Sequence, residues 1–292
     1  MFEYLFFIFF NMNDYNTNHS WKLFNNKYWQ IHSNQYEQPY ITDAYENNNG
    51  SCPPGMVEIN GLMKQDPDVK LFSGNNIDAL QKLSCKTWLN KEPIWKDRCK
   101  EYDRSKWINM SSSYSVRPMR YCIDRFESGV RKGEYPIVMI NYDEADNVCK
   151  VRSDRLCSEL EWTFACEGEE AMPYPYGYIR DENKCVIDKA WRQYSNNLFP
   201  RNTVSSMKEL DKLWQGEAAG SRKYCRSPFG VYDMTGNVDE ITSASYKDSK
   251  YKMVLKGGYW GGNVRNRCRA ATRSHDESFA FYQASFRCCR DL

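Results

Sequence analysis

Apolar and polar residues change places over short distances in this chain, which predicts short strands and helices joined by long irregular segments. Residues 52–57 open a strand-like stretch, and residues 136–140, Pro-Ile-Val-Met-Ile, form an apolar run typical of a buried strand. Residues 254–287 alternate strand-like pieces with loops, whereas residues 173–230 are rich in Pro, Gly, Tyr and Asn and are expected to be mostly irregular. We therefore expect an α+β fold with little regular secondary structure.

Two helices are predicted in the middle of the chain. The first begins at Asp143 and carries Cys149 toward the core. The second begins after Ser158, because Ser158 and Glu161 fit a capping box, in which each side chain accepts a hydrogen bond from the backbone N–H of the other residue. Gly168 is a natural end for this second helix.

The local composition of the sequence also suggests how the chain is divided into segments. Residues 11–50 are rich in Asn and Tyr and show no sustained apolar period, as in a tail or linker. Residues 64–118 are polar, contain two cysteines and are interpreted as an excursion tied by a disulfide. We therefore predict an Asn-rich N-terminal segment, residues 1–50, and a domain formed by residues 51–292.

Charge and hydropathy exclude several classes of function. The 292-residue chain has 40 Lys and Arg residues against 38 Asp and Glu residues, so its formal charge of +2 favours neither nucleic acid nor an anionic lipid surface as a partner. The apolar run at residues 4–10 is far shorter than the ~20 residues of a membrane-spanning helix. It is also a poor export signal, because Glu3 occupies the place of a basic n-region and no A-x-A motif follows.

Twelve cysteines are the strongest signal in the composition. No two of them have the C-x2-C spacing of a zinc site, and the three histidines are isolated from one another. An even number of scattered cysteines indicates disulfides and an extracytoplasmic or secreted protein, the alternative being reduced structural thiols in a cytosolic protein. The cysteines are Cys52, Cys85, Cys99, Cys122, Cys149, Cys157, Cys166, Cys185, Cys225, Cys268, Cys288 and Cys289.

Short motifs between Gly55 and Cys288 form an ordered set. They are residues 55–59 (GMVEI), 155–162 (RLCSELEW), 229–240 (FGVYDMTGNVDE), and 255–260 (LKGGYW) followed by 285–288 (SFRC). Together they resemble the formylglycine-generating enzyme family, also called the sulfatase-modifying-factor domain. The resemblance covers roughly residue 52 to the C-terminus and implies an irregular α+β fold related to the C-type lectin fold, stapled by disulfides.

Active members of that family oxidise a cysteine of a sulfatase to formylglycine, using Cu(I) held by two cysteine thiolates, ligands that suit this soft ion. In this chain Gly262 stands where the family has the first copper cysteine, and the segment before Cys268 is too short for the second. Tyr259 replaces the family's serine beside the site. Copper and oxidase activity are therefore not expected.

The resemblance assigns the cysteines to structural roles. It implies one disulfide between Cys149 and Cys288 and another between Cys166 and Cys268, each joining a helix to the C-terminal strands. Cys157 and Cys289 adjoin the first pair and are plausible partners. Pairings of Cys185 with Cys225, and among Cys52, Cys85, Cys99 and Cys122, remain open.

The resemblance also implies a structural calcium site. The matching ligands are the side chains of Asp233 and Glu240 and the backbone carbonyls of Gly236 and Val238, a mixture of oxygens that suits Ca²⁺. The alternative is a solvated acidic turn. At a second family calcium site the aligned residues are Val186 and Ile187, which lack a side-chain oxygen, and Asp239 replaces a tryptophan of the family's substrate groove.

A ligand groove is predicted near the lost copper position. Its candidates are the aromatic residues Tyr259 and Trp260 together with Arg265 and Arg273. The arginines at 265, 267, 269 and 273 suit a carboxylate or sulfate. The alternatives are internal ion pairs for the arginines and core packing for the aromatic residues.

These observations predict a non-catalytic, extracytoplasmic recognition module that binds calcium and an unidentified protein, peptide or glycan. The alternative is an enzyme on the same scaffold, a formylglycine-generating or other oxidoreductase acting on a protein cysteine. A further possibility is that Cys85 or Cys99 supplies copper ligands, which requires these thiols to be free and close to Gly262.

Overall fold

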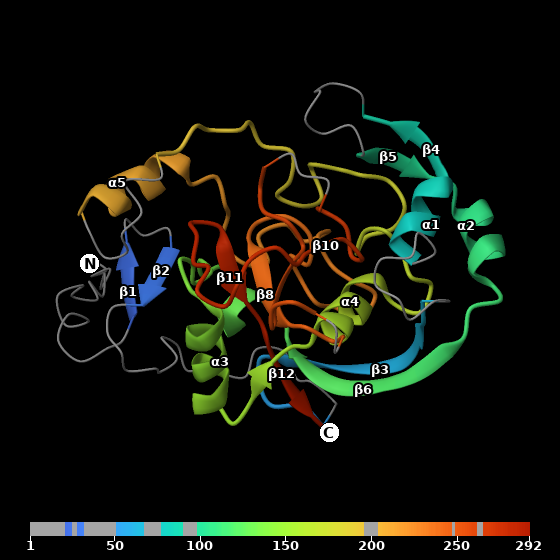
Figure 1. Ribbon diagram of the computed structural model, residues 1–292, viewed down its shortest axis with the longest axis horizontal. Coiled ribbons are helices and arrows are strands. Elements are labelled where there is room, and N and C mark those ends of the chain that lie inside the picture. Colours follow the sequence, from blue (N-terminus) through green and yellow to red (C-terminus); the bar gives the residue numbers. More distant parts are fainter. Residues whose placement is uncertain are drawn as a thin grey trace, which may run out of the picture.

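The computed structural model describes residues 21–24, 28–31, 51–66, 77–89, 98–195, 204–246, 249–261 and 265–292. Two four-stranded sheets form its framework (Figure 1). The first has the strand order β3-β6-β12-β7, and all of its strand pairs are antiparallel. Its strands are β3 (Met56–Lys64), β6 (Val116–Asp124), β7 (Arg155–Leu156) and β12 (Cys288–Asp291).

The alternation of side chains in β3 explains how this sheet packs. Val57, Ile59 and Met63 are buried, whereas Asn60 and Leu62 on the opposite face are exposed. Because successive residues of a strand point to opposite faces, one face of the sheet covers the core and the other meets solvent. The strand-like stretch predicted near residues 52–57 is therefore confirmed, and the strand extends to Lys64.

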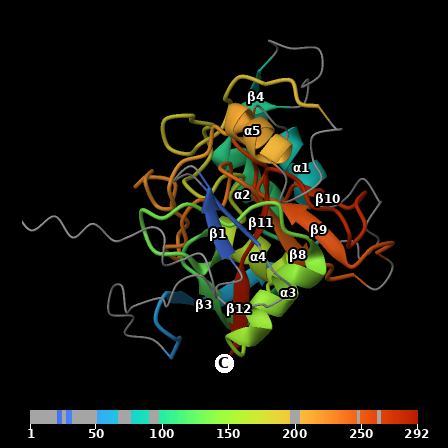
Figure 2. The ribbon, with the colours of Figure 1, turned by 90° about the vertical axis from the view of Figure 1, so that its left-hand side faces the viewer.

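The second sheet has the order β10-β9-β8-β11 and contains the C-terminal motifs. Strand β11 runs parallel to β8 and pairs Ser285 with Glu240, which brings two distant parts of the sequence together. In Figure 2, β8, β9 and β10 lie next to one another. The strands are β8 (Asp239–Ser243), β9 (Met253–Lys256), β10 (Ala271–Thr272) and β11 (Ala284–Phe286), as expected for alternating short strands and loops.

Both predicted helices are present, and the capping box predicted for the second one is confirmed. Helix α3 (Tyr142–Val151) begins with a capping box between Asn141 and Glu144, one residue before the expected start. Helix α4 (Glu159–Glu167) has the predicted capping box and ends at Gly168, whose φ is 67°. Trp162 and Phe164 of α4 pack in one core cluster with residues of β3 and β6, and α4 also contacts β8 and β9, so this helix lies between the two sheets.

The excursion forms a small subdomain at one end of the molecule (Figure 1). A disulfide between Cys85 and Cys99 joins its two strands. Asp78 of its first helix forms an ion pair with buried Arg267, at 2.6 Å, which ties the excursion to the C-terminal region. Its elements are α1 (Ile77–Leu83), β4 (Cys85–Trp88), β5 (Cys99–Tyr102) and α2 (Arg104–Ser111).

Three segments differ from the sequence expectation. Residues 136–140 are buried but form no strand, because Met139 has a positive φ of 60° that interrupts an extended backbone. Helix α5 (Val204–Leu213) lies in the segment expected to be irregular. In the N-terminal segment, β1 (Trp21–Phe24) and β2 (Tyr28–Ile31) form an antiparallel hairpin.

Candidate functional site

The predicted calcium turn runs from Asp233 to Glu240 and enters strand β8. It depends on left-handed backbone conformations, with φ values of 59° at Asp233, 84° at Gly236 and 55° at Asn237. A Cβ atom at Gly236 would lie 2.3 Å from the backbone oxygen of Val186, so only glycine fits there. The sequence therefore folds the turn tightly against the segment that precedes it.

The Glu240 carboxylate is fully buried in this turn. Its Oε2 accepts hydrogen bonds from Trp162 Nε1 at 2.7 Å and from Arg287 Nε at 2.8 Å, and its Oε1 accepts one from Arg287 Nη2 at 2.9 Å. Arg287 is also buried and donates to the backbone oxygens of Asp124 and Tyr232. This guanidinium therefore links β6, β8 and the C-terminal strand segment.

Two more carboxylates lie near Glu240. Glu127, in the 3-10 helix Glu127–Gly129, accepts hydrogen bonds from the Asn237 side chain at 2.5 Å and the Val238 amide at 3.3 Å. The Asp233 side chain accepts one from the Gly220 amide at 2.7 Å. Glu127 and Asp233 are both buried, and the charges of all three carboxylates affect one another.

Burial in this arrangement disfavours the charged forms of Asp233 and Glu127. Burial raises the pKa of Asp233 to about 7, and the Glu240 carboxylate adds to the rise, although the Gly220 amide and Arg287 oppose it. Burial and the charges of Asp233 and Glu240 raise the pKa of Glu127 well above its ordinary value. A divalent cation bound at these oxygens would oppose the effect of burial on both groups, so the site suits such an ion.

The donor set also suits calcium rather than an ion held by side chains alone. Among the described residues no three His, Cys, Asp or Glu side chains are arranged as a metal cluster. The predicted set uses two carboxylates and two backbone carbonyls, a mixture that is typical of Ca²⁺. Glu240 Oε1 accepts a single hydrogen bond and keeps a lone pair for an ion.

The position of the second family calcium site is apolar. Val186 and Ile187 are almost fully buried, and they pack beside the disulfide between Cys185 and Cys225. The structure thus provides no side-chain oxygen at these two positions.

Aromatic side chains fill the region that follows the Gly257-Gly258 pair. Trp260 is buried and packs edge-to-face against Trp214 at a centroid distance of 4.8 Å, and Tyr259 contacts both Trp260 and Tyr282. The cavity beside these rings has a volume of only about 10 Å³. Gly262, at the first copper cysteine position, lies outside the described residues. We call this group the aromatic cluster; it comprises Tyr194, Trp214, Tyr259, Trp260, Phe281 and Tyr282.

An ion pair occupies the position of the family's groove tryptophan. Arg265 donates two hydrogen bonds to the buried carboxylate of Asp239, at 2.7 and 2.9 Å. Arg273 instead pairs with Glu159 at the start of α4. Of the four predicted groove residues, the structure therefore places Tyr259, Trp260 and Arg265 together and directs Arg273 to a different partner.

The other arginines of this stretch are also used internally. Arg267 pairs with Asp78, and Arg269 forms two hydrogen bonds with Glu167, both at 2.6 Å. Internal ion pairing was the alternative predicted for the arginine series, and it is confirmed for all four.

All twelve cysteines are joined in six disulfides. The predicted bonds Cys149–Cys288 and Cys166–Cys268 are both present, and so is Cys157–Cys289. The bond between Cys85 and Cys99 contradicts the possibility that either residue is a free copper ligand. The open pairings are resolved as Cys52–Cys122, Cys85–Cys99 and Cys185–Cys225. So many disulfides fit an oxidising compartment.

Glu127 and Arg287 complete the acidic turn and were not predicted from the sequence as members of the site. Arg287 carries a signal in the sequence, because it follows Phe286 and precedes two cysteines, whereas Glu127 lies among the polar residues Asp124, Arg125 and Ser128 and carries none. Charged residues are rarely buried unless they are paired, so their role depends on contacts across the fold.

In the described part of the chain, no helix is long and apolar enough to cross a membrane.

Fold and site together define a disulfide-linked α+β domain with a buried acidic turn and an aromatic cluster. The family model of the "Sulfatase-modifying factor enzyme 1-like domain" matches residues 80–292. The chain belongs to this family, as its motifs predicted, and the fold class predicted from them is confirmed.

The curated relatives found by sequence share this resemblance. A Bos taurus protein named "Inactive C-alpha-formylglycine-generating enzyme 2" is 29% identical over 169 residues, which is 55% of this chain and 52% of that protein. Its Mus musculus counterpart is 31% identical over 169 residues, 55% of this chain and 51% of that protein. This chain therefore spans about half the length of the curated relatives it matches.

Solved structures with a similar chain path are more distant. PvdO from Pseudomonas aeruginosa is 15% identical, with a TM-score of 0.44 over 81% of this chain and 94% of that one. CarF is 13% identical, with a TM-score of 0.45 over 81% of this chain and 98% of that one.

Proposed function

We propose that this chain is a non-catalytic recognition domain of the family, that it acts outside the cytoplasm, and that it holds a structural calcium ion. The observation that carries the non-catalytic role is the pairing of every cysteine in a disulfide. Cu(I) requires soft thiolate ligands, and the family's oxidase chemistry depends on two of them. A chain whose cysteine sulfurs are all cross-linked has no thiolate to offer.

Two further observations support this role. The aromatic cluster leaves a cavity of about 10 Å³ beside Tyr259, too small for a peptide side chain to approach a metal. The curated relatives from cattle and mouse are themselves named inactive. Loss of catalysis on a retained fold is consistent with a binding role, because one fold can carry many functions.

The calcium ion would be held by the turn. Asp233 and Glu240 would supply carboxylate oxygens, and Gly236 and Val238 would supply backbone carbonyls. The ion supplies positive charge to a buried acidic site and constrains the turn that leads into β8. Glu127 orients the turn by accepting hydrogen bonds from Asn237 and Val238.

A copper titration combined with an oxygen-uptake assay tests the proposal. The disulfide-bonded protein is titrated with Cu(I) against a chromogenic Cu(I) chelator, and oxygen uptake is then measured with a peptide that contains a single cysteine. We expect no stoichiometric copper and no turnover, whereas an active formylglycine-generating enzyme provides the positive control. Stoichiometric copper with turnover would overturn the proposal in favour of the oxidoreductase.

A variant identifies the source of any copper that does bind. Cys85 and Cys99 form the disulfide of the excursion, the position considered for alternative ligands. If copper binding were lost in Cys85→Ser/Cys99→Ser but retained in Cys52→Ser/Cys122→Ser, the excursion would be the ligand source. A peptide map under non-reducing conditions provides the matched check of the six disulfides.

A further inference from the structure

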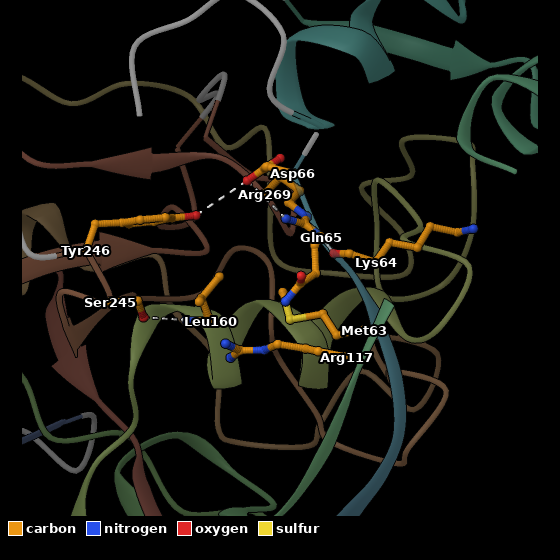
Figure 3. Close-up of a pocket in the computed structure, with 9 residues that line it drawn as sticks. All are labelled: Met63, Lys64, Gln65, Asp66, Arg117, Leu160, Ser245, Tyr246 and Arg269. Carbon is orange, nitrogen blue, oxygen red and sulfur yellow. Dashed lines mark hydrogen bonds and ion pairs between the residues drawn. The ribbon is translucent and has the colours of Figure 1, made fainter. Parts of the chain in front are cut away.

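A second hollow lies away from the aromatic cluster, between the end of β3, the start of β6, helix α4 and the loop after β8 (Figure 3). It has a volume of about 240 Å³. Met63 and Leu160 form its apolar part, and Tyr246 forms the opposite wall. A cavity of this size with apolar and polar walls is suited to a small ligand group.

Most of the charges around this hollow are already neutralised. Asp66 accepts hydrogen bonds from the Ile77 amide at 2.6 Å and from the Tyr246 hydroxyl at 3.4 Å, and it lies 3.7 Å from Arg269. Arg269 is itself held by two hydrogen bonds to buried Glu167. Neither of these groups is available as a free charge.

Arg117 is different. Arg117 Nε donates a hydrogen bond to the sulfur of Met119 at 3.2 Å. Within the described part of the chain, no carboxylate pairs with the Arg117 guanidinium. Figure 3 shows this guanidinium extending into the hollow beneath Leu160, with the side-chain amide of Gln65 also directed inward. An unpaired guanidinium beside an amide is a good binding group for a carboxylate or sulfate oxyanion.

Tyr246 also lines a second hollow. This second hollow has a volume of about 370 Å³ and is lined by Tyr246, Lys250, Tyr251 and Lys252, among others. Lys250 is exposed and lies over the Tyr251 ring, with Nζ 4.8 Å from its centroid. These two lysines and two tyrosine rings, together with the Glu277 carboxylate, thus line this second hollow.

We infer that these two hollows bind an acidic glycan, with an oxyanion of one sugar at Arg117 and the next acidic group at Lys250 and Lys252. This inference rests on the proposed recognition function and names the chemistry of its ligand. Tyrosine rings can stack on the apolar faces of sugars, while the cations bind carboxylate or sulfate groups. The hydrogen bond to Asp66 holds the Tyr246 ring in place between the two hollows.

An extended acidic peptide fits the surface less well. Peptides commonly bind by adding a strand to an exposed sheet edge, and β3 is the edge strand next to the hollow. At that edge the Leu62 amide already donates to Glu169 at 2.7 Å, and the Lys64 carbonyl accepts from Arg269 at 2.8 Å. Two of the backbone groups that a peptide strand would need beside the hollow are therefore occupied.

The test uses a heparin-derived hexasaccharide, its desulfated counterpart and a hexaglutamate peptide, each titrated into the full chain by calorimetry. We expect the sulfated hexasaccharide to bind one to one and more tightly than either of the other probes. Arg117→Gln should weaken its binding by about tenfold or more, the effect of losing a charge-assisted contact. Lys250→Gln/Lys252→Gln should weaken it as well.

Arg120→Gln is the matched control. Arg120 lies on β6 with Arg117, but three residues along the strand it points to the other face, where it pairs with Glu58. Both substitutions change the net charge equally, so Arg120→Gln should bind the hexasaccharide as the unmodified chain does. Equal melting temperatures of the two variants show that both are folded.

Three results would overturn the inference: no binding of the hexasaccharide, equal losses in Arg117→Gln and Arg120→Gln, or equally tight, Arg117-dependent binding of hexaglutamate. Each of these leaves the copper titration unaffected. If the chain binds neither copper nor the hexasaccharide, the proposed non-catalytic function stands and only the inference of an acidic glycan ligand is rejected. A chain that turns over a cysteine peptide loses the proposed function whatever the glycan does.

Discussion

The acidic turn at residues 233–240 and the segment after Gly257-Gly258 are the two places where the motifs were compared with metal sites of the family, and the side chains at the two places differ. In the turn, Glu240 is buried and paired with Arg287, and Asp233 is buried and accepts a hydrogen bond from the Gly220 amide. After the glycine pair, the described residues form the aromatic cluster and the Asp239–Arg265 ion pair.

The contacts of each region explain this difference. Arg287 connects Glu240 to the backbone of Asp124 and Tyr232, so the acidic turn is part of the core of both sheets. The loss of one charged member would leave the others buried without a partner. The aromatic cluster is held by apolar packing, which tolerates exchange of side chains when volume is conserved. Substitutions should therefore be tolerated better in the aromatic cluster than in the acidic turn.

The largest effect that separates the two regions is expected at Arg287. Arg287→Met removes the guanidinium but leaves the carboxylates of Glu240, Glu127 and Asp233 buried, so we expect a loss of about 3–5 kcal/mol in the free energy of unfolding. Denaturation in urea with the disulfides intact measures it. The double variant Glu240→Gln/Arg287→Met should recover part of the loss, because it also removes a buried charge.

Arg120→Met provides the control for this substitution. Its ion pair with Glu58 is largely exposed, so the loss should be about 0–1 kcal/mol. If Arg287→Met were no more destabilising than Arg120→Met, the acidic turn would not be part of the core in the sense argued above.

Calcium should give the next largest effect, and only in the acidic turn. At a free calcium concentration of 100 times Kd, a single site stabilises the folded state by about 2.7 kcal/mol. For a domain of this size that free energy corresponds to a rise in Tm of about 5–10 °C, measured by scanning calorimetry in CaCl2 and in a chelator. Asp233→Ala should abolish the difference, because it removes a proposed ligand.

Glu58→Gln is the carboxylate control for calcium, because Glu58 pairs with Arg120 at the surface. This substitution should leave the calcium-dependent rise in Tm unchanged. An identical Tm of the unmodified chain in CaCl2 and in chelator would contradict the calcium proposal. The acidic turn would then be a buried network that Arg287 alone balances.

Local patterns allowed much of this fold to be predicted. The capping box at Ser158 and Glu161 gave the start of α4, and the strand-like stretch that opens at residues 52–57 indicated β3, because both signals lie within a few consecutive residues. Helix α5 was missed because Pro, Gly, Tyr and Asn dominate the segment around it, although its own hydrophobic pattern is helical. The strand expected at residues 136–140 was wrong because a run of apolar residues does not reveal the positive φ of Met139.

The candidate site was predictable where the motifs carry its residues. Motif positions gave Asp233 and Glu240 and the family disulfides, but not their contacts. The pairing of Glu240 with Arg287 joins residues 47 positions apart, and Asn237 bonds Glu127 across 110 positions. Partners so distant in sequence are set by the tertiary fold. The same reason explains why Arg273, predicted to lie in the groove, pairs with Glu159 instead.

The smallest expected effect tests the aromatic cluster. Tyr259→Ser restores the serine that the family has beside its copper site and removes ring contacts with Trp260 and Tyr282. Each such contact contributes about 0.5–1.5 kcal/mol, so we expect the free energy of unfolding to fall by about 1–2 kcal/mol. Tyr224→Ser, at an exposed tyrosine, should change it by less than about 0.5 kcal/mol.

Tyr259→Ser should also show no oxygen uptake with a cysteine peptide, because serine in place of tyrosine opens space but provides no thiolate. If Tyr259→Ser were as stable as Tyr224→Ser, the rings would not hold this region. If Tyr259→Ser gained oxygen uptake with the cysteine peptide, the packing of the tyrosine ring, and not the absence of thiolates, would explain why the chain lacks this activity.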